Sequence, residues 1–241
     1  MDDGEVLTRV RQLRERGSSP KQIARVLGLR PAQVAPLVRR VAEQDQAQPD
    51  PAQRELLGCW ISPEWSIGLG LDQTPGWAEL DQAGSADPAS SGGLACVLIA
   101  RRERASRATV CGFLVDVYCL GVKNVIGPLG MGAGSLDAYR REYFSAFDRP
   151  GLPVPIELAQ QVVHGAVGYA RTLGFEPPDD FGPAAAYLGE PTTPAPIRFG
   201  RDGTPWYISG PHDNPRAVLD TLSTTAGPDN FHYIVVSPVH A

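Results

Sequence analysis

The residue whose surroundings most clearly suggest chemistry is Asp116, a carboxylate within the apolar segment 112–124, GFLVDVYCLGVKN. A buried aspartate needs hydrogen bonds or an opposite charge, because moving an unpaired charge out of water is costly. Lys123, in the same segment, is an available partner. Asp116 is therefore either a catalytic or metal-binding carboxylate, or a structural residue that forms an ion pair or lies on the solvated face of the strand. The structural interpretation is favoured, because no second carboxylate recurs nearby.

The remaining histidines and acidic residues form no spacing typical of a metal or catalytic site. His164 has no His or Glu four residues away, which excludes an HExxH zinc motif. A metal site would need His164 to converge with His212 and with Asp179 or Asp180, and no spacing requires this. No GxSxG motif is present. We therefore expect no metal and no cofactor.

Two segments each have a functional and a structural interpretation. Residues 127–134, GPLGMGAG, lack the spacing of a dinucleotide fingerprint and the lysine of a phosphate loop, which predicts a flexible loop. Residues 139–147, YRREYFSAF, would stack on RNA bases if their aromatic rings were exposed. The four-residue spacing of Tyr139, Tyr143 and Phe147 favours packing against a core instead.

The elements that must position these residues form an α+β domain over residues 56–241, which follows a polar, proline-containing linker at 44–55. Apolar and β-branched runs predict a mixed, mainly antiparallel sheet of four or five strands with about three helices. We expect a loop at 72–93, followed by strands 94–100 and 109–119, which are joined by RRERASR with the second strand central. The expected helices are 136–147 with Ser135 as N-cap, 156–173, and 215–225 capped by Asn214 and Pro215. Residues 197–199 and 206–208 should form a hairpin around Asp202-Gly203, and 231–236 a closing strand.

Composition is that of an ordinary globular protein, with 42% apolar and 20% charged residues in a chain of 241. No apolar run reaches the roughly 18–20 residues of a membrane span. The N-terminus, MDDGEV, lacks the apolar region of a secretory signal. The cysteines form no CxxC pair and stand among apolar neighbours, which is typical of buried thiols in a reducing compartment: Cys59, Cys96, Cys111 and Cys119. We expect a cytoplasmic protein without membrane contact.

The first 43 residues predict a separate three-helix domain. A first amphipathic helix covers residues 5–16. The second begins with Ser19 as N-cap and Pro20 at its first position, and it ends at Gly28, where a positive φ is cheap only for glycine. The apolar face of the third helix recurs with helical spacing: Val34, Leu37, Val38 and Val41.

Residues 20–40, PKQIARVLGLRPAQVAPLVRR, resemble the helix-turn-helix superfamily. Ala24 and Gly28 occupy the positions at which the two helices of that motif cross. The resemblance implies that the second of these helices lies in the major groove of DNA and that the exposed polar residues contact nucleic acid. These residues are Lys21, Arg25, Arg30, Gln33, Arg39 and Arg40. Segment 112–124 resembles segments of uncharacterised bacterial proteins. This resemblance gives no activity to assign to the chain.

The start of the third helix is unusual for a reader of DNA sequence. Pro31, Ala32, Ala35 and Pro36 offer no hydrogen bonds to base edges. Pro36 would also remove an internal helix bond if the helix began at Pro31, whereas a later start near Ala35 would avoid that cost. Contacts with nucleic acid are therefore expected to be electrostatic.

Charge is distributed unevenly along the chain. Residues 1–45 contain nine Lys/Arg and six Asp/Glu, a net charge of +3, while the remaining 13 basic and 21 acidic residues carry −8. This asymmetry is compatible with a nucleic-acid-binding N-terminal domain.

The sequence thus predicts a DNA-binding transcriptional regulator without enzymatic activity. Its C-terminal domain would sense a ligand, form a homodimer or dock a partner. One alternative is an RNA- or ribosome-associated factor that uses the N-terminal domain as a docking module. Another is a hydrolase or nuclease centred on Asp116.

Overall fold

The computed structural model describes residues 3–15, 18–46, 50–71, 76–81, 92–192 and 197–235. Contacts within the chain divide it into two compact units, Met1–Pro49 and Asp50–Ala241, here called the head and the body. The division lies within the predicted linker, but residues 50–55 belong to the body. Most of the predicted loop 72–93 lies outside the described residues. In the described ranges, no helix is long and apolar enough to cross a membrane.

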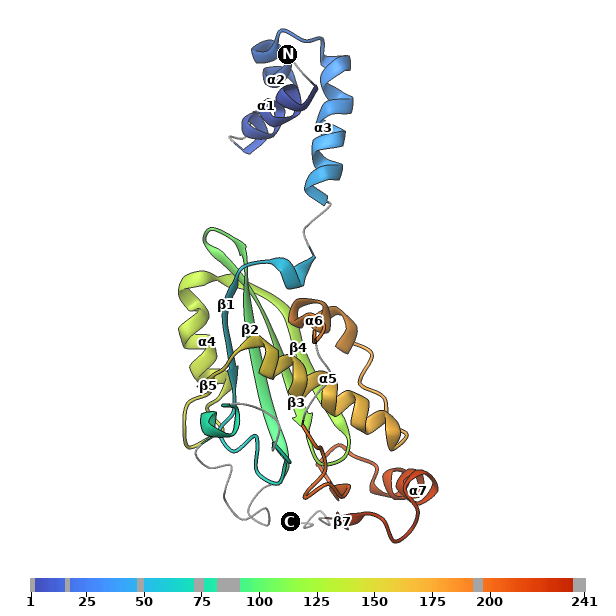
Figure 1. Cartoon of the computed structure of the whole chain (residues 1–241). Coiled ribbons are helices and arrows are strands. Elements are labelled where there is room, and N and C mark those ends of the chain that lie inside the picture. The colour runs from blue at the N-terminus through green and yellow to red at the C-terminus, as the bar shows by residue number, and fades with distance from the viewer. Residues whose placement is uncertain are drawn as a thin grey trace, which may run out of the picture. The chain divides into compact units, whose positions relative to one another are not determined.

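The head contains three helices, α1 (Asp3–Glu15), α2 (Pro20–Leu27) and α3 (Pro31–Gln46) (Figure 1). Their apolar faces meet in a small core. Its buried members are Val10, Ile23, Ala24, Val34 and Val41. Helical periodicity in the sequence therefore identified the residues that bury one helix against another.

The body is built on a five-stranded antiparallel sheet with the order β4-β3-β2-β1-β5 (Figure 1). Its strands are β1 (Leu56–Ile61), β2 (Leu94–Arg104), β3 (Arg107–Asp116), β4 (Gly121–Gly132) and β5 (Leu152–Pro153). The α+β class and the antiparallel β2–β3 hairpin agree with the sequence prediction. The central position, however, belongs to β2 rather than to β3.

Two segments predicted as loops are strands. Most of the charged connection RRERASR continues β2 and β3, leaving only Ala105 and Ser106 in the turn. The prediction of a flexible loop at 127–134 is wrong as far as Gly132, because β4 extends that far and pairs with β3. Glycine content misled this prediction, since alternate glycines lower strand propensity without preventing backbone pairing.

The helices of the body are α4 (Leu136–Tyr143), α5 (Ile156–Thr172), α6 (Phe181–Leu188) and α7 (Pro215–Thr225). Helix α7 has the predicted bounds, and the Asn214 side chain accepts a hydrogen bond from the N–H of Ala217. Helix α4 is shorter than predicted, and Ser135 caps it without a side-chain hydrogen bond. The sequence prediction missed α6, which is short and apolar on all sides.

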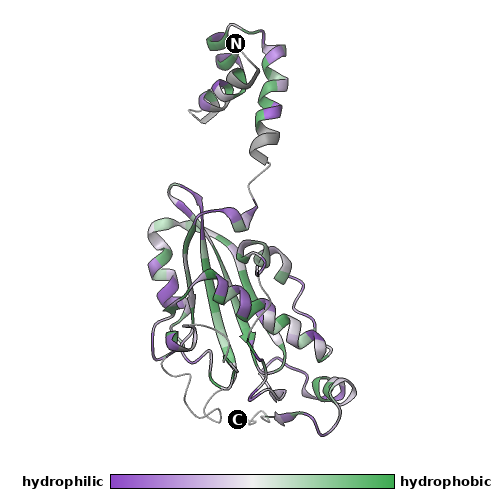
Figure 2. Cartoon of the chain, viewed as in Figure 1, coloured by the Kyte–Doolittle hydropathy of each residue, from purple (hydrophilic) through white to green (hydrophobic). Residues whose placement is uncertain are grey.

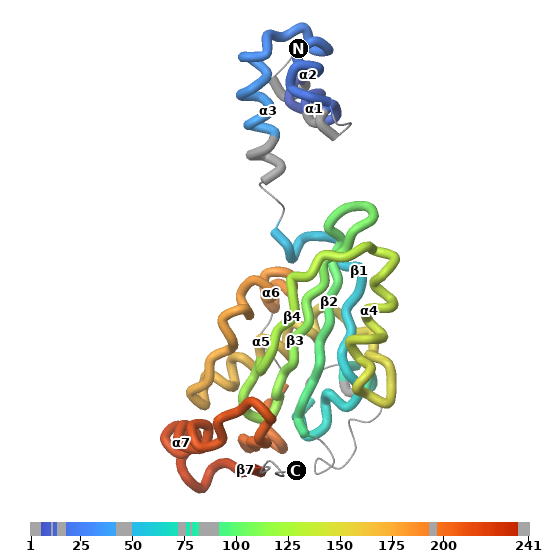
Figure 3. The backbone as a smooth tube through the Cα atoms, turned by 180° about the vertical axis from the view of Figure 1, so that it is seen from behind, coloured from blue at the N-terminus to red at the C-terminus, as the bar shows by residue number. Residues whose placement is uncertain are grey.

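The two faces of the sheet bury different partners. Helices α5 and α6 pack on one face, and the strands beneath them are rich in hydrophobic residues (Figures 1 and 2). On the opposite face, seen in Figure 3, α4 packs beside β1. Tyr139, Tyr143 and Phe147 join this second core, and the Tyr143 hydroxyl donates to the carbonyl of Val97. The structural interpretation of 139–147 is therefore confirmed.

The C-terminal part of the body departs most from prediction. Strands β6 (Trp206–Ile208) and β7 (His232–Ile234) pair in parallel with each other. The predicted hairpin of 197–199 with 206–208 is wrong, because Arg201 and Thr204 bridge the turn but residues 206–208 pair with β7. Arg198 instead pairs with Gly70.

Arg101 fastens the first residues of the body to the sheet. This β2 residue is only 6% exposed. Its Nη1 donates to the carbonyl of Arg54 at 2.8 Å, and its Nε donates to the carbonyl of Tyr187, in α6, at 2.5 Å. The neighbouring Arg102 pairs with Glu55 on the surface. Residues 54 and 55 are thus held by side chains of β2, which explains why they belong to the body.

Replacing Arg101 and Arg102 by Met separates the buried contact from the exposed one. Arg101→Met leaves two carbonyls without their donor, so we expect the free energy of unfolding to fall by about 2 kcal/mol or more. Arg102→Met removes a surface ion pair and should cost less than about 1 kcal/mol. Urea denaturation measures both, and equal losses would contradict this assignment.

Candidate nucleic-acid interface

Helix α2 begins with a reciprocal cap. The Ser19 Oγ accepts the N–H of Gln22 at 3.4 Å, and the Ser19 N–H donates to Oε1 of Gln22 at 2.7 Å. This capping box satisfies two backbone N–H groups around the helix start. Ser19 is therefore the N-cap, as the sequence predicted, and Pro20 follows at the first helical position.

A left-handed residue separates α2 from α3. Gly28 has φ 66° and ψ 25°, and its N–H donates to the carbonyl of Ala24. The N–H of Leu29 donates to the same carbonyl at 2.9 Å. A Cβ at Gly28 would meet no atom within 4 Å. Conformation alone therefore makes glycine favourable at this position.

Helix α3 begins at Pro31 and not near Ala35. Pro36 consequently lies inside the helix and provides no N–H for the usual internal bond. At the helix start, the N–H of Arg30 donates to Oε1 of Gln33 at 3.0 Å. Gln33, predicted to contact nucleic acid, thus uses its side-chain oxygen to cap the helix and retains its NH₂ group for an external partner.

The contact between α2 and α3 is closely packed and apolar. Ile23 and Val34 are fully buried, and Ala24 is 4% exposed. The small side chain of Ala24 leaves room for the second helix. This contact and the turn at Gly28 together set the direction in which α3 leaves α2.

All predicted phosphate-contacting side chains of this segment are on the surface. Lys21 and Arg25 are four residues apart on α2 and share a helix face. Arg30 lies in the turn, and Arg39 and Arg40 lie on α3. The exposed cations are therefore Lys21, Arg25, Arg30, Arg39 and Arg40. Arginine and lysine at exposed positions are suited to contacts with phosphate oxygens.

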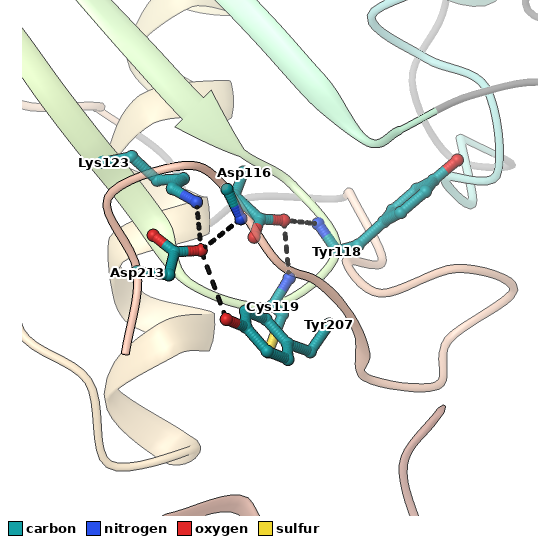
Figure 4. A network of polar contacts seen from close by, with 7 residues as sticks. Asp116, Tyr118, Cys119, Lys123, Tyr207 and Asp213 are labelled. Carbon is teal, nitrogen blue, oxygen red and sulfur yellow. Dashed lines mark hydrogen bonds and ion pairs between the residues drawn. The ribbon is translucent and has the colours of Figure 1, made fainter. Parts of the chain in front are cut away.

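Asp116, the candidate catalytic carboxylate, lies in the body and supports a turn. Its side chain is buried, and the residue is 4% exposed. Figure 4 shows its Oδ1 accepting the N–H groups of Tyr118 at 2.9 Å and Cys119 at 3.0 Å. These residues belong to the tight connection from β3 to β4. Burial raises the pKa of Asp116 to about 6, against the opposing effects of the backbone N–H groups and the charge of Lys123.

The predicted ion pair of Asp116 with Lys123 is wrong. Lys123 Nζ lies 2.8 Å from Oδ2 of Asp213, in the loop before α7. The same oxygen accepts the N–H of Gly210 at 2.8 Å and the hydroxyl of Tyr207 at 3.4 Å (Figure 4). Burial opposes ionisation of Asp213, but the hydrogen bonds and the charge of Lys123 outweigh it and lower the pKa.

This network fastens the C-terminal segment to the end of the sheet. Lys123 and Asp213 are 90 residues apart, so no local spacing in the sequence indicates their contact. Asp213 and Tyr207 are therefore neighbours of Lys123 that the sequence did not predict. The bonds that Asp116 accepts are those of a structural residue, and they assign it no catalytic role.

The other candidate ligands are not brought into a metal site. In the described parts of the chain, no group of three or more His, Cys, Asp and Glu side chains could hold a metal ion. Nε2 of His164 lies 3.0 Å from the carbonyl oxygen of Gly189. His212 is an exposed loop residue, and Asp179 and Asp180 immediately precede α6.

A groove of about 730 Å³ lies along α5 and α6. Its volume falls within the range of small-molecule sites. Its charged and histidine side chains have partners within the chain, because His164 contacts the Gly189 carbonyl and lies 3.9 Å from Glu190, Arg171 pairs with Glu176, and Asp50 accepts the N–H of Ala52. The groove therefore provides no set of convergent, available polar groups that would define a ligand.

Comparison with models of protein families, with curated proteins and with solved structures found no match.

Substitution of Gly28 tests the turn between α2 and α3. Gly28→Ala should lower the stability of the head by about 1–2 kcal/mol, because alanine disfavours the left-handed conformation. Gly28→Asn should cost less, since asparagine tolerates that conformation better. Denaturation followed through amide NMR signals of the head measures both variants. An alanine variant as stable as the original chain would contradict the left-handed turn.

Titration of Asp116 tests its structural role. A folded pKa of about 6 exceeds the ordinary value of 3.8, so the folded state binds more protons between these limits. Stability should therefore decline, by about 2 kcal/mol, as pH rises from about 4.5 to about 7. The pKa of Asp213 is lowered on folding, so its effect on stability has the opposite sign to that of Asp116. Its contribution to the free energy of unfolding is lost only as pH falls below the ordinary pKa of an aspartate.

Asp116→Asn should remove this decline while keeping an oxygen for the backbone N–H groups. Urea denaturation at the two pH values, with NMR titration of the Asp116 carboxyl, measures the effect. An NMR midpoint below about 4 would contradict a raised pKa.

Proposed function

We propose that the chain binds DNA through α2 and α3 of the head. The observation that carries the proposal is a pair of helices joined by a left-handed Gly28 turn, packed through the buried Ala24, with five exposed cations along one short segment. The resemblance of residues 20–40 to the helix-turn-helix superfamily extends the proposal to transcriptional regulation. That extension is an analogy of fold, since fold alone does not fix function.

The chemistry of the exposed side chains favours contacts with phosphates over contacts with bases. Arginine and lysine provide charge, and arginine provides a planar fork of donors that fits phosphate oxygens. Pro31, Ala32 and Ala35, near the start of α3, provide no side-chain hydrogen bonds. Gln33 has one group left for an external contact, because its oxygen caps the helix. The proposed binding mode is therefore electrostatic, with weak discrimination between DNA sequences.

The salt dependence of binding tests this mode. Each phosphate contact releases counterions, so affinity should fall with salt at a log–log slope near −0.9 per contact. The five exposed cations of the head, of which three to five are usable, predict that the head contributes roughly −3 to −4 to the slope measured for the full chain with a short DNA duplex. Fluorescence anisotropy at several salt concentrations measures the slope.

Variants of the head test whether the salt dependence of binding comes from residues of α2, the turn and α3. Arg30→Ala and Arg39→Ala should each reduce its magnitude by about one and weaken binding to all duplexes alike. Arg9→Ala is the matched control, because it removes an exposed arginine from α1, whose side chain contacts Gln12. Arg9→Ala should leave the slope within error.

Affinity that is indifferent to salt and to loss of both Arg30 and Arg39 would refute this function. The head would then be a protein-docking module. A loss at Arg30→Ala confined to one preferred duplex would instead indicate a contact with guanine.

A further inference from the structure

The tip of the β2–β3 hairpin places two arginines opposite each other. Arg104 and Arg107 are paired in register across the turn of Ala105 and Ser106, and all four residues are exposed. Like charges directly opposite each other on paired strands are destabilising. Among the described residues, neither arginine has a carboxylate within ion-pair distance. The tip thus carries two positive charges that the described part of the chain leaves without a counter-charge.

The nearby carboxylates already have partners. Glu103 pairs with Arg54 and accepts the hydroxyl of Thr109. Glu55 forms an ion pair with Arg102. Residues 54, 55 and 101–107 include five arginines and two glutamates, so this region is positive on a chain whose residues beyond position 45 carry −8. A local positive field of this kind attracts polyanions.

Glycines stand beside the two arginines at positions 130, 132 and 134. Gly132 is the partner of Arg107 on β4, and a Cβ there would approach nothing closer than 3.8 Å. A Cβ at Gly134 would meet no atom within 4 Å. At Gly130 the nearest atom would be Nη2 of Arg107, at 3.2 Å, so glycine leaves room for that guanidinium. Gly130, Gly132 and Gly134 therefore place no side chain beside the tip.

The tip is also accessible. It projects beyond the end of β1 in both Figure 1 and Figure 3, and Figure 2 shows its residues as hydrophilic. Ser106 and Ser135 add two exposed hydroxyl groups at the same end of the sheet, where the N–H of Ala133 donates to the carbonyl of Ser106. Ser135 makes no side-chain hydrogen bond to cap α4.

We propose that this tip, formed by Arg104, Ser106, Arg107 and residues 130–135, is a second surface that binds DNA phosphates. A phosphate between the two guanidinium groups offsets their mutual repulsion, and arginine matches its oxygens with paired donors. The assignment rests on the proposed function of the head for its choice of DNA as the polyanion. With this second surface, the body would contact DNA directly.

The test uses the full chain, a short DNA duplex and fluorescence anisotropy over salt concentrations from about 50 to about 200 mM. Arg104→Ala with Arg107→Ala should reduce the magnitude of the log–log slope by roughly two. Arg104→Lys with Arg107→Lys keeps both charges and should keep most of the slope. Because the altered side chains are exposed and their mutual repulsion is removed in the alanine variant, the melting temperature should not fall.

The matched control removes two exposed arginines elsewhere in the body, by Arg141→Ala on α4 and Arg216→Ala on α7. It subtracts the same net charge and should leave the slope near that of the unaltered chain. An equal loss in this control would overturn the proposal, because the effect would then come from overall charge and not from the tip.

The outcomes separate this proposal from the function of the head. If Arg30→Ala and Arg39→Ala weaken binding but the tip variant does not, the tip proposal is overturned and the head retains its function. If the tip variant reduces the slope while the head variants do not, the tip binds DNA and the function of the head fails. If the unaltered chain binds no duplex at low salt, both fail.

Discussion

The body depends on the register between β2 and β3. This antiparallel pairing runs from Leu94 opposite Asp116 to Arg104 opposite Arg107, with a two-residue turn at one end. Because side chains alternate along a strand, the register decides which residues face α5 and α6 and which face α4. It also places a buried carboxylate at one end of the hairpin and two exposed arginines at the other.

Buried polar groups join the remaining segments to that sheet. Arg101 holds the first residues of the body and α6 through two carbonyl groups. Asp116 holds the turn into β4, while Lys123 and Asp213 hold the segment before α7. Each group would be costly to bury without its partner. These contacts therefore fix segments to the sheet in addition to the apolar packing of α6 and α7.

The sequence predicted what local periodicity and capping determine. The three helices of the head, the β2–β3 hairpin and the bounds of α7 follow from spacing, from Gly28 and from Asn214. The pairing of β6 with β7 and the contact of Lys123 with Asp213 join residues far apart in the chain, which no local pattern specifies. Among the candidate site residues, exposure of the cations was predictable, whereas the capping role of Gln33 depends on backbone geometry.

The central claim is that cations on α2, in the following turn and on α3 contact DNA phosphates. The most direct test is to record backbone amide NMR spectra of the full chain during titration with a short DNA duplex. The account predicts shifts at Lys21, Arg25 and Arg30 in the head and at Arg104 and Arg107 in the body, all reversed by added salt. Shifts confined to the groove along α5 and α6, with the amides of α2 and α3 unchanged, would contradict it.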